Sequence, residues 1–93
     1  MKAKHCCIEI LNLLRQVGAT EWCKPFEYLI TLYDSHDLKR FFSEVKKIYA
    51  GSNSFNDLVL YKNDNLCFEE NETLDNLRHK LYQEFIKYKL IES

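Results

Sequence analysis

The chain has 93 residues, and we expect a single helical domain over residues 1–93. Leu, Ile, Val and Phe make up about 30% of it, above the level of a disordered chain, whereas two Gly and one Pro are too few for the many turns of a β-sandwich or barrel. A net charge of −1 and a pI near 6.3 argue against direct nucleic-acid binding, and no apolar run is long enough to cross a bilayer.

The first helix is predicted over residues 7–17, where apolar residues recur with the 3-4 spacing of an amphipathic helix. Gly18 is its predicted stop, because glycine readily adopts the left-handed backbone found at helix C-termini. This stretch does not resemble a secretory signal, since Glu9, Asn12 and Arg15 interrupt any apolar run. We therefore expect a cytoplasmic protein whose four cysteines are free thiols.

The second helix is predicted from the apolar stripe between Trp22 and Tyr33. Thr20 is a candidate N-cap, because its hydroxyl can accept a hydrogen bond from a free backbone N–H of the first turn. Pro25 leaves a second interpretation open, since proline is favoured at the first position of a helix. In that interpretation residues 20–24 form a separate turn and the helix begins at Pro25.

The third helix has the clearest helical pattern, from Leu38 to Tyr49. Ser35 and Asp37 are both candidates for its N-cap. Gly51 is its predicted end. Because the connections between the first three helices are short, we expect neighbouring helices to run antiparallel.

Residues 51–70 are not predicted to be helical. Within them, Ser54 and Asp57 fit a capping box, in which each side chain accepts a hydrogen bond from the other's backbone N–H. Two short apolar runs then flank the polar residues 62–65, which suggests a β-hairpin that needs a helix to pack on. An irregular loop is the alternative.

The fourth helix is predicted to start near Asn71 or Thr73. It would bury residues at helical spacing: Leu74, Leu77, Leu81, Phe85 and Tyr88. The predicted fold class is therefore all-α or mainly α, a small four-helix bundle with an irregular loop or short β-hairpin between helices three and four.

One motif is distinctive, and it lies between the third helix and the final helix: Gly51-Ser52-Asn53-Ser54-Phe55-Asn56-Asp57-Leu58-Val59-Leu60. With it the chain resembles a family of small bacterial helical proteins of unknown function whose hallmark is a Gly-Ser-x-x-hydrophobic-Asn-Asp-Leu stretch. Here Ser52-Asn53 stand where a second glycine-rich turn is expected. The family offers no catalytic residues to carry over, but some members resemble the immunity partners of bacterial competition toxins.

The same motif also has a purely structural interpretation. Its polar side chains would satisfy backbone groups in a tight turn, since Asn, Asp and Ser commonly do so. Phe55, Leu58 and Leu60 would then fill the bundle.

Charge is unevenly distributed along the chain. Residues 55–76 hold six acidic residues and one lysine, a net charge of −5, while the remainder carries +4. An acidic surface with an exposed aromatic residue suits a basic protein partner, because complementary charge speeds encounter and gives specificity. The candidate partner-binding residues are Asp57, Tyr61, Asp64, Glu69, Glu70, Glu72 and Asp75. The alternative is a solvated loop that charge keeps soluble.

We expect no cofactor and no metal, because the four cysteines show no metal-ligand spacing. The preferred hypothesis is a non-enzymatic immunity-type protein that binds a cognate toxin and blocks it by occlusion. A nuclease toxin fits, because nucleases use basic clefts to bind phosphates. A generic interaction or regulatory module is the alternative. A small enzyme that pairs Cys23 or Cys67 with His36 or His79 ranks last, since no motif aligns these residues.

Overall fold

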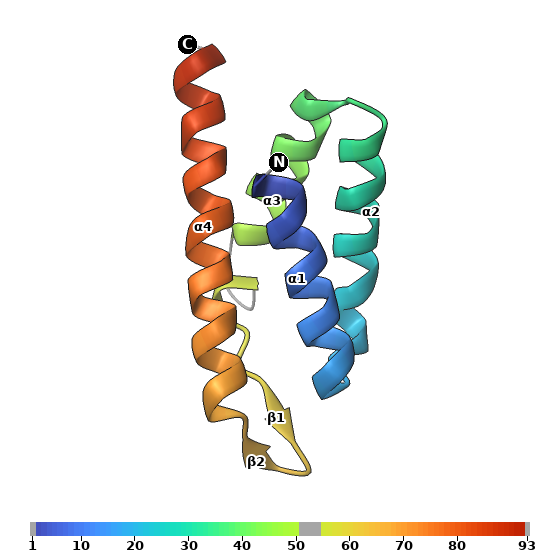
Figure 1. The fold of residues 1–93 in the computed structure, drawn as a ribbon, viewed down its shortest axis with the longest axis vertical. Coiled ribbons are helices and arrows are strands. Elements are labelled where there is room, and N and C mark those ends of the chain that lie inside the picture. The colour runs from blue at the N-terminus through green and yellow to red at the C-terminus, as the bar shows by residue number, and fades with distance from the viewer. Residues whose placement is uncertain (1, 51–54, 93) are drawn as a thin grey trace.

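The computed structural model describes residues 2–50 and 55–92. In this part of the chain four helices run alternately up and down, and a two-stranded hairpin precedes the last of them (Figure 1). Helix α1 packs against α2 and α4, and α3 packs against α2 and α4. The prediction of a mainly α four-helix bundle is confirmed, and the hairpin alternative is confirmed over the irregular loop.

Helix α1 spans Lys2–Val17 and so begins earlier than the predicted residue 7. Ala3 and Cys6 are both buried, so the apolar stripe continues toward the N-terminus. The helix ends as predicted at Gly18, whose φ of +78° lies in the left-handed region.

Helix α2 spans Cys23–Asp34 and follows a 3₁₀ turn at Thr20–Trp22. The prediction of Thr20 as an N-cap is wrong, since no side chain caps either element. Pro25 lies in the first turn of α2, where a backbone N–H has no helical acceptor, so the helix forms through it without loss. The structure is thus closer to the interpretation with a separate turn, although the helix begins two residues before Pro25.

Helix α3 spans Leu38–Tyr49. Of its two candidate caps, Asp37 is the N-cap, and its carboxylate accepts a hydrogen bond from a backbone N–H three residues on, at 3.2 Å. Ser35 instead closes α2. The predicted stop at Gly51 and the Ser54 half of the predicted capping box lie outside the described residues.

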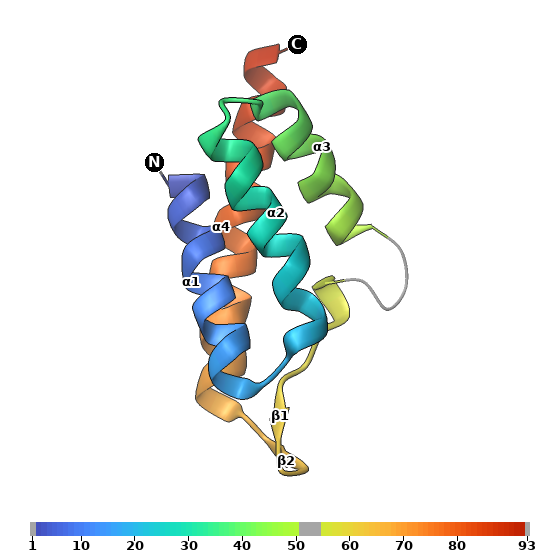
Figure 2. The ribbon, with the colours of Figure 1, turned by 90° about the vertical axis from the view of Figure 1, so that its right-hand side faces the viewer.

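The hairpin pairs β1, Tyr61–Lys62, with β2, Asn65–Leu66, in antiparallel register. Its two turn residues, Asn63 and Asp64, have φ values of 53° and 63°. Positive φ at both positions is the backbone of the type I′ turn, which matches the twist of the strands and favours Asn and Asp. The hairpin projects at the end of the bundle where α1 ends and α4 begins (Figure 2).

Helix α4 spans Phe68–Glu92, and its predicted start at Asn71 or Thr73 is wrong by three to five residues. The backbone N–H of Asn71 donates to the Cys67 carbonyl at 2.9 Å, so the helix has already formed there. Acidic residues 69 and 70 suit this first turn because the helix dipole favours negative charge. Although α4 has 25 residues, no helix in residues 2–50 and 55–92 is both long and apolar enough to cross a membrane.

The core lies between the four helices. Fully buried aliphatic residues include Ile10, Leu14, Leu29, Leu74 and Leu81. Of the predicted α4 stripe, Tyr88 is half-buried and the other members are buried. Phe55 and Leu60 are fully buried and Leu58 is half-buried, so the motif does fill the bundle as predicted.

Candidate functional site

Asn71 fixes the hairpin to α4. The Cys67 N–H donates to the Leu60 carbonyl at 3.0 Å, as in an antiparallel ladder. In a ladder the Leu60 N–H would donate to the Cys67 carbonyl in return, but here the carboxamide of Asn71 lies between these two groups. Its Oδ1 accepts a hydrogen bond from the Leu60 N–H at 2.8 Å. Its Nδ2 donates to the Cys67 carbonyl at 2.8 Å and to the Leu60 carbonyl at 3.0 Å. One side chain therefore holds both legs of the hairpin.

Arg78 fixes the segment that leads into the hairpin. Its side chain is only 11% exposed, and Nη1 donates to the carbonyls of Phe55 at 2.6 Å and Leu58 at 3.0 Å. Nη2 pairs with the exposed carboxylate of Asp75, and the guanidinium lies 5.5 Å from the centre of the Phe55 ring. Hydrogen bonds from a charged donor are stronger than neutral ones, so Arg78 is a principal tie between α4 and this segment.

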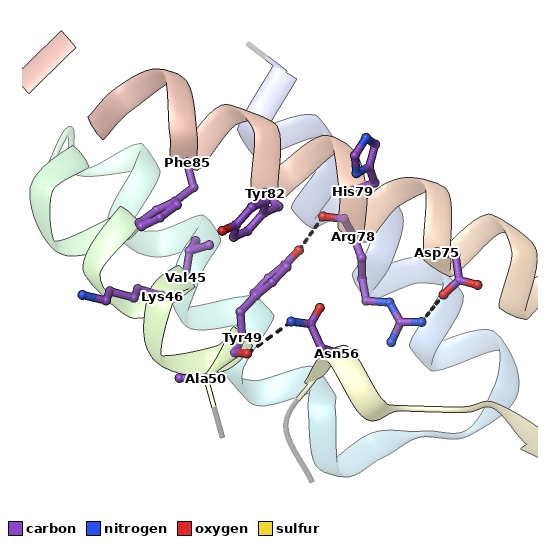
Figure 3. A pocket seen from close by; sticks show the side chains of 10 residues that line it. All are labelled: Val45, Lys46, Tyr49, Ala50, Asn56, Asp75, Arg78, His79, Tyr82 and Phe85. Carbon is purple, nitrogen blue, oxygen red and sulfur yellow. Dashed lines mark hydrogen bonds and ion pairs between the residues drawn. The ribbon is translucent and has the colours of Figure 1, made fainter. Parts of the chain in front are cut away.

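A cleft of about 570 Å³ separates α3 from the middle of α4 (Figure 3). The Tyr49 hydroxyl donates to the Arg78 carbonyl at 2.8 Å, and burial raises the pKa of Tyr49. The Tyr49 ring stacks on Tyr82, with centroids 5.9 Å apart, and Asn56 Nδ2 donates to the Tyr49 carbonyl at 3.2 Å. These polar groups hold the elements of the bundle together.

A second hollow of about 410 Å³ lies between the hairpin and the start of α4. Its lining includes Val59, Leu66, Phe68 and Glu72. It shares Asp75 and Arg78 with the first cleft, so the two hollows adjoin along one side of α4.

Four apolar side chains are exposed on the hairpin and at the start of α4, and we call them the hairpin patch: Val59, 47% exposed, Tyr61, 58%, Leu66, 48%, and Phe68, 77%. All but Tyr61 line the second hollow. Tyr61 lies directly opposite Leu66 in the hairpin, so both side chains point to the same face. The buried residues Leu60 and Cys67 anchor the hairpin on the core side. An exposed apolar patch on an anchored element is typical of a protein interaction site.

Four of the seven predicted site residues lie at or beside the hairpin patch. Tyr61 belongs to it, and Asp64 lies in the turn between its strands. Glu72 and Asp75 line the hollow next to Phe68, because residues spaced by four and three share one helix face. The carboxylates of Asp64, Glu72 and Asp75 therefore lie beside the apolar side chains of the hairpin patch.

The other three predicted residues lie apart from the hollow. Asp57 is exposed at the end of the 3₁₀ turn Phe55–Asp57. Glu69 and Glu70 are in the first turn of α4, but neither lines the hollow. Successive residues of a helix are rotated by about 100°, so their side chains point away from Phe68.

Sequence reasoning did not identify Asn71, Arg78 and Phe68 as residues of this site. The sequence does contain a signal for Asn71 and Arg78. They share one stripe of helical 3-4 spacing with Leu74, Leu81 and Phe85, so they are polar residues on the apolar face of the helix. A polar side chain at a buried position needs hydrogen-bond partners, which here are backbone groups of the hairpin segment.

The buried thiols are poorly suited to chemistry. Burial raises the pKa of Cys7 to about 12 and also raises that of Cys6. Cys23 and His36 lie at opposite ends of α2. Among the described residues, no three His, Cys, Asp or Glu side chains lie close enough together to hold a metal ion.

The fold and this site together define a small helical bundle that presents an anchored, partly apolar hairpin. A family model described as a domain of unknown function (DUF6966) matches residues 15–67, more than half of the chain, and the protein therefore belongs to that family. The match includes the hairpin and the motif at 51–60 but ends before α4, so Asn71 and Arg78 lie beyond it. Comparisons with curated proteins and with solved structures gave no match.

Proposed function

We propose that this chain is a non-enzymatic immunity-type protein that binds a cognate bacterial toxin and neutralises it by covering its functional surface. The observation that carries the proposal is the hairpin patch, in which exposed apolar side chains lie beside Asp64, Glu72 and Asp75. The resemblance of the motif at 51–60 to a family with immunity-like members adds the toxin as the class of partner.

The charges around the patch favour a basic partner. Between residues 55 and 76, Lys62 is the one basic residue against six acidic ones. Acidic groups at the rim would draw a basic surface into contact, while the apolar centre would hold it there. A nuclease fits this description, because its phosphate-binding cleft is basic and an acidic surface can occupy it.

The anchoring of the hairpin supports binding without rearrangement. Asn71 and Arg78 fix the hairpin and the segment before it through hydrogen bonds to the Phe55, Leu58, Leu60 and Cys67 backbone. A surface that is already ordered loses little conformational entropy on binding, which favours a tight complex. The mechanism would be occlusion, with no turnover and no cofactor.

The proposal is tested by neutralisation. A tagged chain is used to capture its partner from the native strain, and the gene of the captured protein is then expressed in a host with and without this chain. We expect growth arrest that the wild-type chain relieves and the Phe68→Glu variant does not. Ile8→Glu, a change at an exposed residue of α1, is the matched control and should relieve arrest fully.

Two results would overturn the proposal. A captured protein with no toxicity would favour a generic interaction or regulatory module. Relief by Phe68→Glu equal to that by the wild type would place the interface away from the hairpin patch.

A further inference from the structure

The backbone of the hairpin has groups that point outward from both of its strands. The Cys67 N–H donates to the Leu60 carbonyl. In the next pair toward the turn, Tyr61 lies opposite Leu66. Hydrogen-bonded and non-hydrogen-bonded pairs alternate along an antiparallel ladder, so Tyr61 and Leu66 form a non-hydrogen-bonded pair. The N–H and C=O groups of each residue therefore point away from the other strand.

Val59 continues this outward row on the side of β1. The N–H and the carbonyl of Leu60 both bond the carboxamide of Asn71 on α4, so in an extended chain the groups of Val59 and Tyr61 point away from α4. In Figure 1, β2 lies below the start of α4 and β1 lies on the outer side. Within residues 2–50 and 55–92, no hydrogen bond uses the N–H or C=O of Val59 or Tyr61. We call these two donors and two acceptors the open edge.

The open edge is a better template for an added strand than the outer side of β2. There the chain offers the outward groups of Leu66 and then enters α4, which begins at Phe68. Unpaired N–H and C=O groups at a sheet edge are the groups with which another chain pairs. A third strand also makes a small sheet more stable than a lone hairpin.

The side chains beside the open edge indicate what kind of segment it accepts. Val59 and Tyr61 are exposed members of the hairpin patch, so alternate residues of an added strand would pack beside them. Exposed carboxylates lie at both ends of the edge, Asp57 before it and Asp64 in the turn beyond it. Lys62 lies on the opposite face from Tyr61. The edge therefore suits a segment that combines apolar with basic residues.

We propose that the partner adds an extended, basic segment as a third strand along the open edge. This inference rests on the proposed function, since it gives the form in which the toxin contacts the hairpin patch. Backbone hydrogen bonds supply affinity in this mode of binding, and alternate side chains supply specificity. A second copy of this chain is a poorer occupant: both ends of the open edge are acidic, so pairing edge to edge places like charges together.

The first test selects peptides of about ten residues, long enough to span the edge, from a random phage-displayed library against the full chain. It needs no toxin, so its failure is distinguishable from a failure of the neutralisation test. We expect selected peptides rich in Lys, Arg and β-branched residues. The tightest of them should slow hydrogen exchange of the Tyr61 amide by about tenfold or more. The Leu66 amide on the other edge is the control and should be unchanged.

The second test separates backbone from side chain. Tyr61→Pro removes the N–H of the open edge and Tyr61→Ala keeps it, and proline is tolerated on an edge strand. The proline variant should bind the peptide about tenfold more weakly than the alanine variant, because a carbonyl of the peptide loses its donor. Leu66→Pro and Leu66→Ala, the matched pair on the other edge, should bind it alike. Thermal melts check that each variant folds, and the exchange measurement needs only the wild type.

Four results would overturn the proposal. They are a library that yields no enriched peptide, protection of the Leu66 amide in place of the Tyr61 amide, and equal binding by Tyr61→Pro and Tyr61→Ala when both are folded. The fourth is a dimer of the chain alone in which the Tyr61 amide is already protected, which would make a second copy the occupant.

Discussion

Replacing Arg78 with alanine should destabilise the fold strongly, because this side chain bonds two backbone carbonyls of the segment before the hairpin. A hydrogen bond from a charged donor contributes about 1.5–3 kcal/mol, so two contribute roughly 3–6 kcal/mol. The Arg78 side chain itself lines both hollows, so its removal opens a path by which water can reach the two carbonyls, and we take the lower end, about 3 kcal/mol. The ion pair adds little, because the Asp75 side chain is 67% exposed.

Such a loss is large for a chain of this size, whose total stability is expected to be roughly 5–14 kcal/mol. It corresponds to a fall in Tm of about 12–24 °C, measured by circular dichroism together with a urea titration. Arg78→Lys should be intermediate, since a single ammonium lacks the fork that spans two carbonyls. Asp75→Asn is the control and should cost less than about 1 kcal/mol. An Arg78→Ala variant within 1 kcal/mol of the wild type would refute the assigned role of these bonds.

Three further changes test other parts of the fold. Asn71→Asp should cost about 2 kcal/mol in urea unfolding, because a carboxylate cannot donate to the Leu60 and Cys67 carbonyls. An unchanged urea midpoint would contradict the role of Asn71 in holding the hairpin. Gly18→Ala should lower the free energy of unfolding by about 1 kcal/mol. The added Cβ meets no other atom, but the backbone φ of +78° is strained for alanine. An unchanged urea midpoint would contradict this prediction. Because burial raises the pKa of Cys7 from 9.0 to about 12, the folded state holds the thiol proton more tightly and stability should fall as the pH rises from 9 to 12. Cys7→Ala should flatten that fall, and an equally steep pH profile would show that Cys7 does not cause it.

The helices were predictable because their signals are local. The 3-4 apolar spacing, the left-handed Gly18 and the N-cap at Asp37 depend only on neighbours in the chain. The turn residues Asn63 and Asp64 likewise favour the hairpin over a loop. In each case a short stretch of sequence determines the backbone.

The start of α4 was not predictable in this way. Asn71 is a good N-cap by residue type, but its carboxamide bonds the backbone of Leu60 and Cys67 instead, and these contacts form only when the hairpin packs on the helix. Thr20 likewise suits a cap position by residue type, yet it begins a 3₁₀ turn in which Trp22 packs on Phe55, a contact between residues far apart in the sequence.

The acidic character of the site was predictable from composition, but its arrangement was not. With α4 beginning at Phe68, Glu72 falls on the face of the hollow, while Glu69 and Glu70 do not. Carboxylates that are close in the sequence therefore lie on different faces of α4, because each residue of a helix is rotated by about 100° from the one before it.

The most direct test of partner binding at the hairpin patch is a kinetic comparison with the captured partner. Two double variants remove equal charge: Asp64→Asn with Glu72→Gln beside the patch, and Glu69→Gln with Glu70→Gln away from the hollow. Both should slow association to a similar extent, because steering by charge acts over a distance. The first pair and Phe68→Ala should also raise the dissociation rate, by about tenfold or more for Phe68→Ala. A faster dissociation for the Glu69 and Glu70 pair, with wild-type dissociation for Phe68→Ala, would contradict binding at this patch.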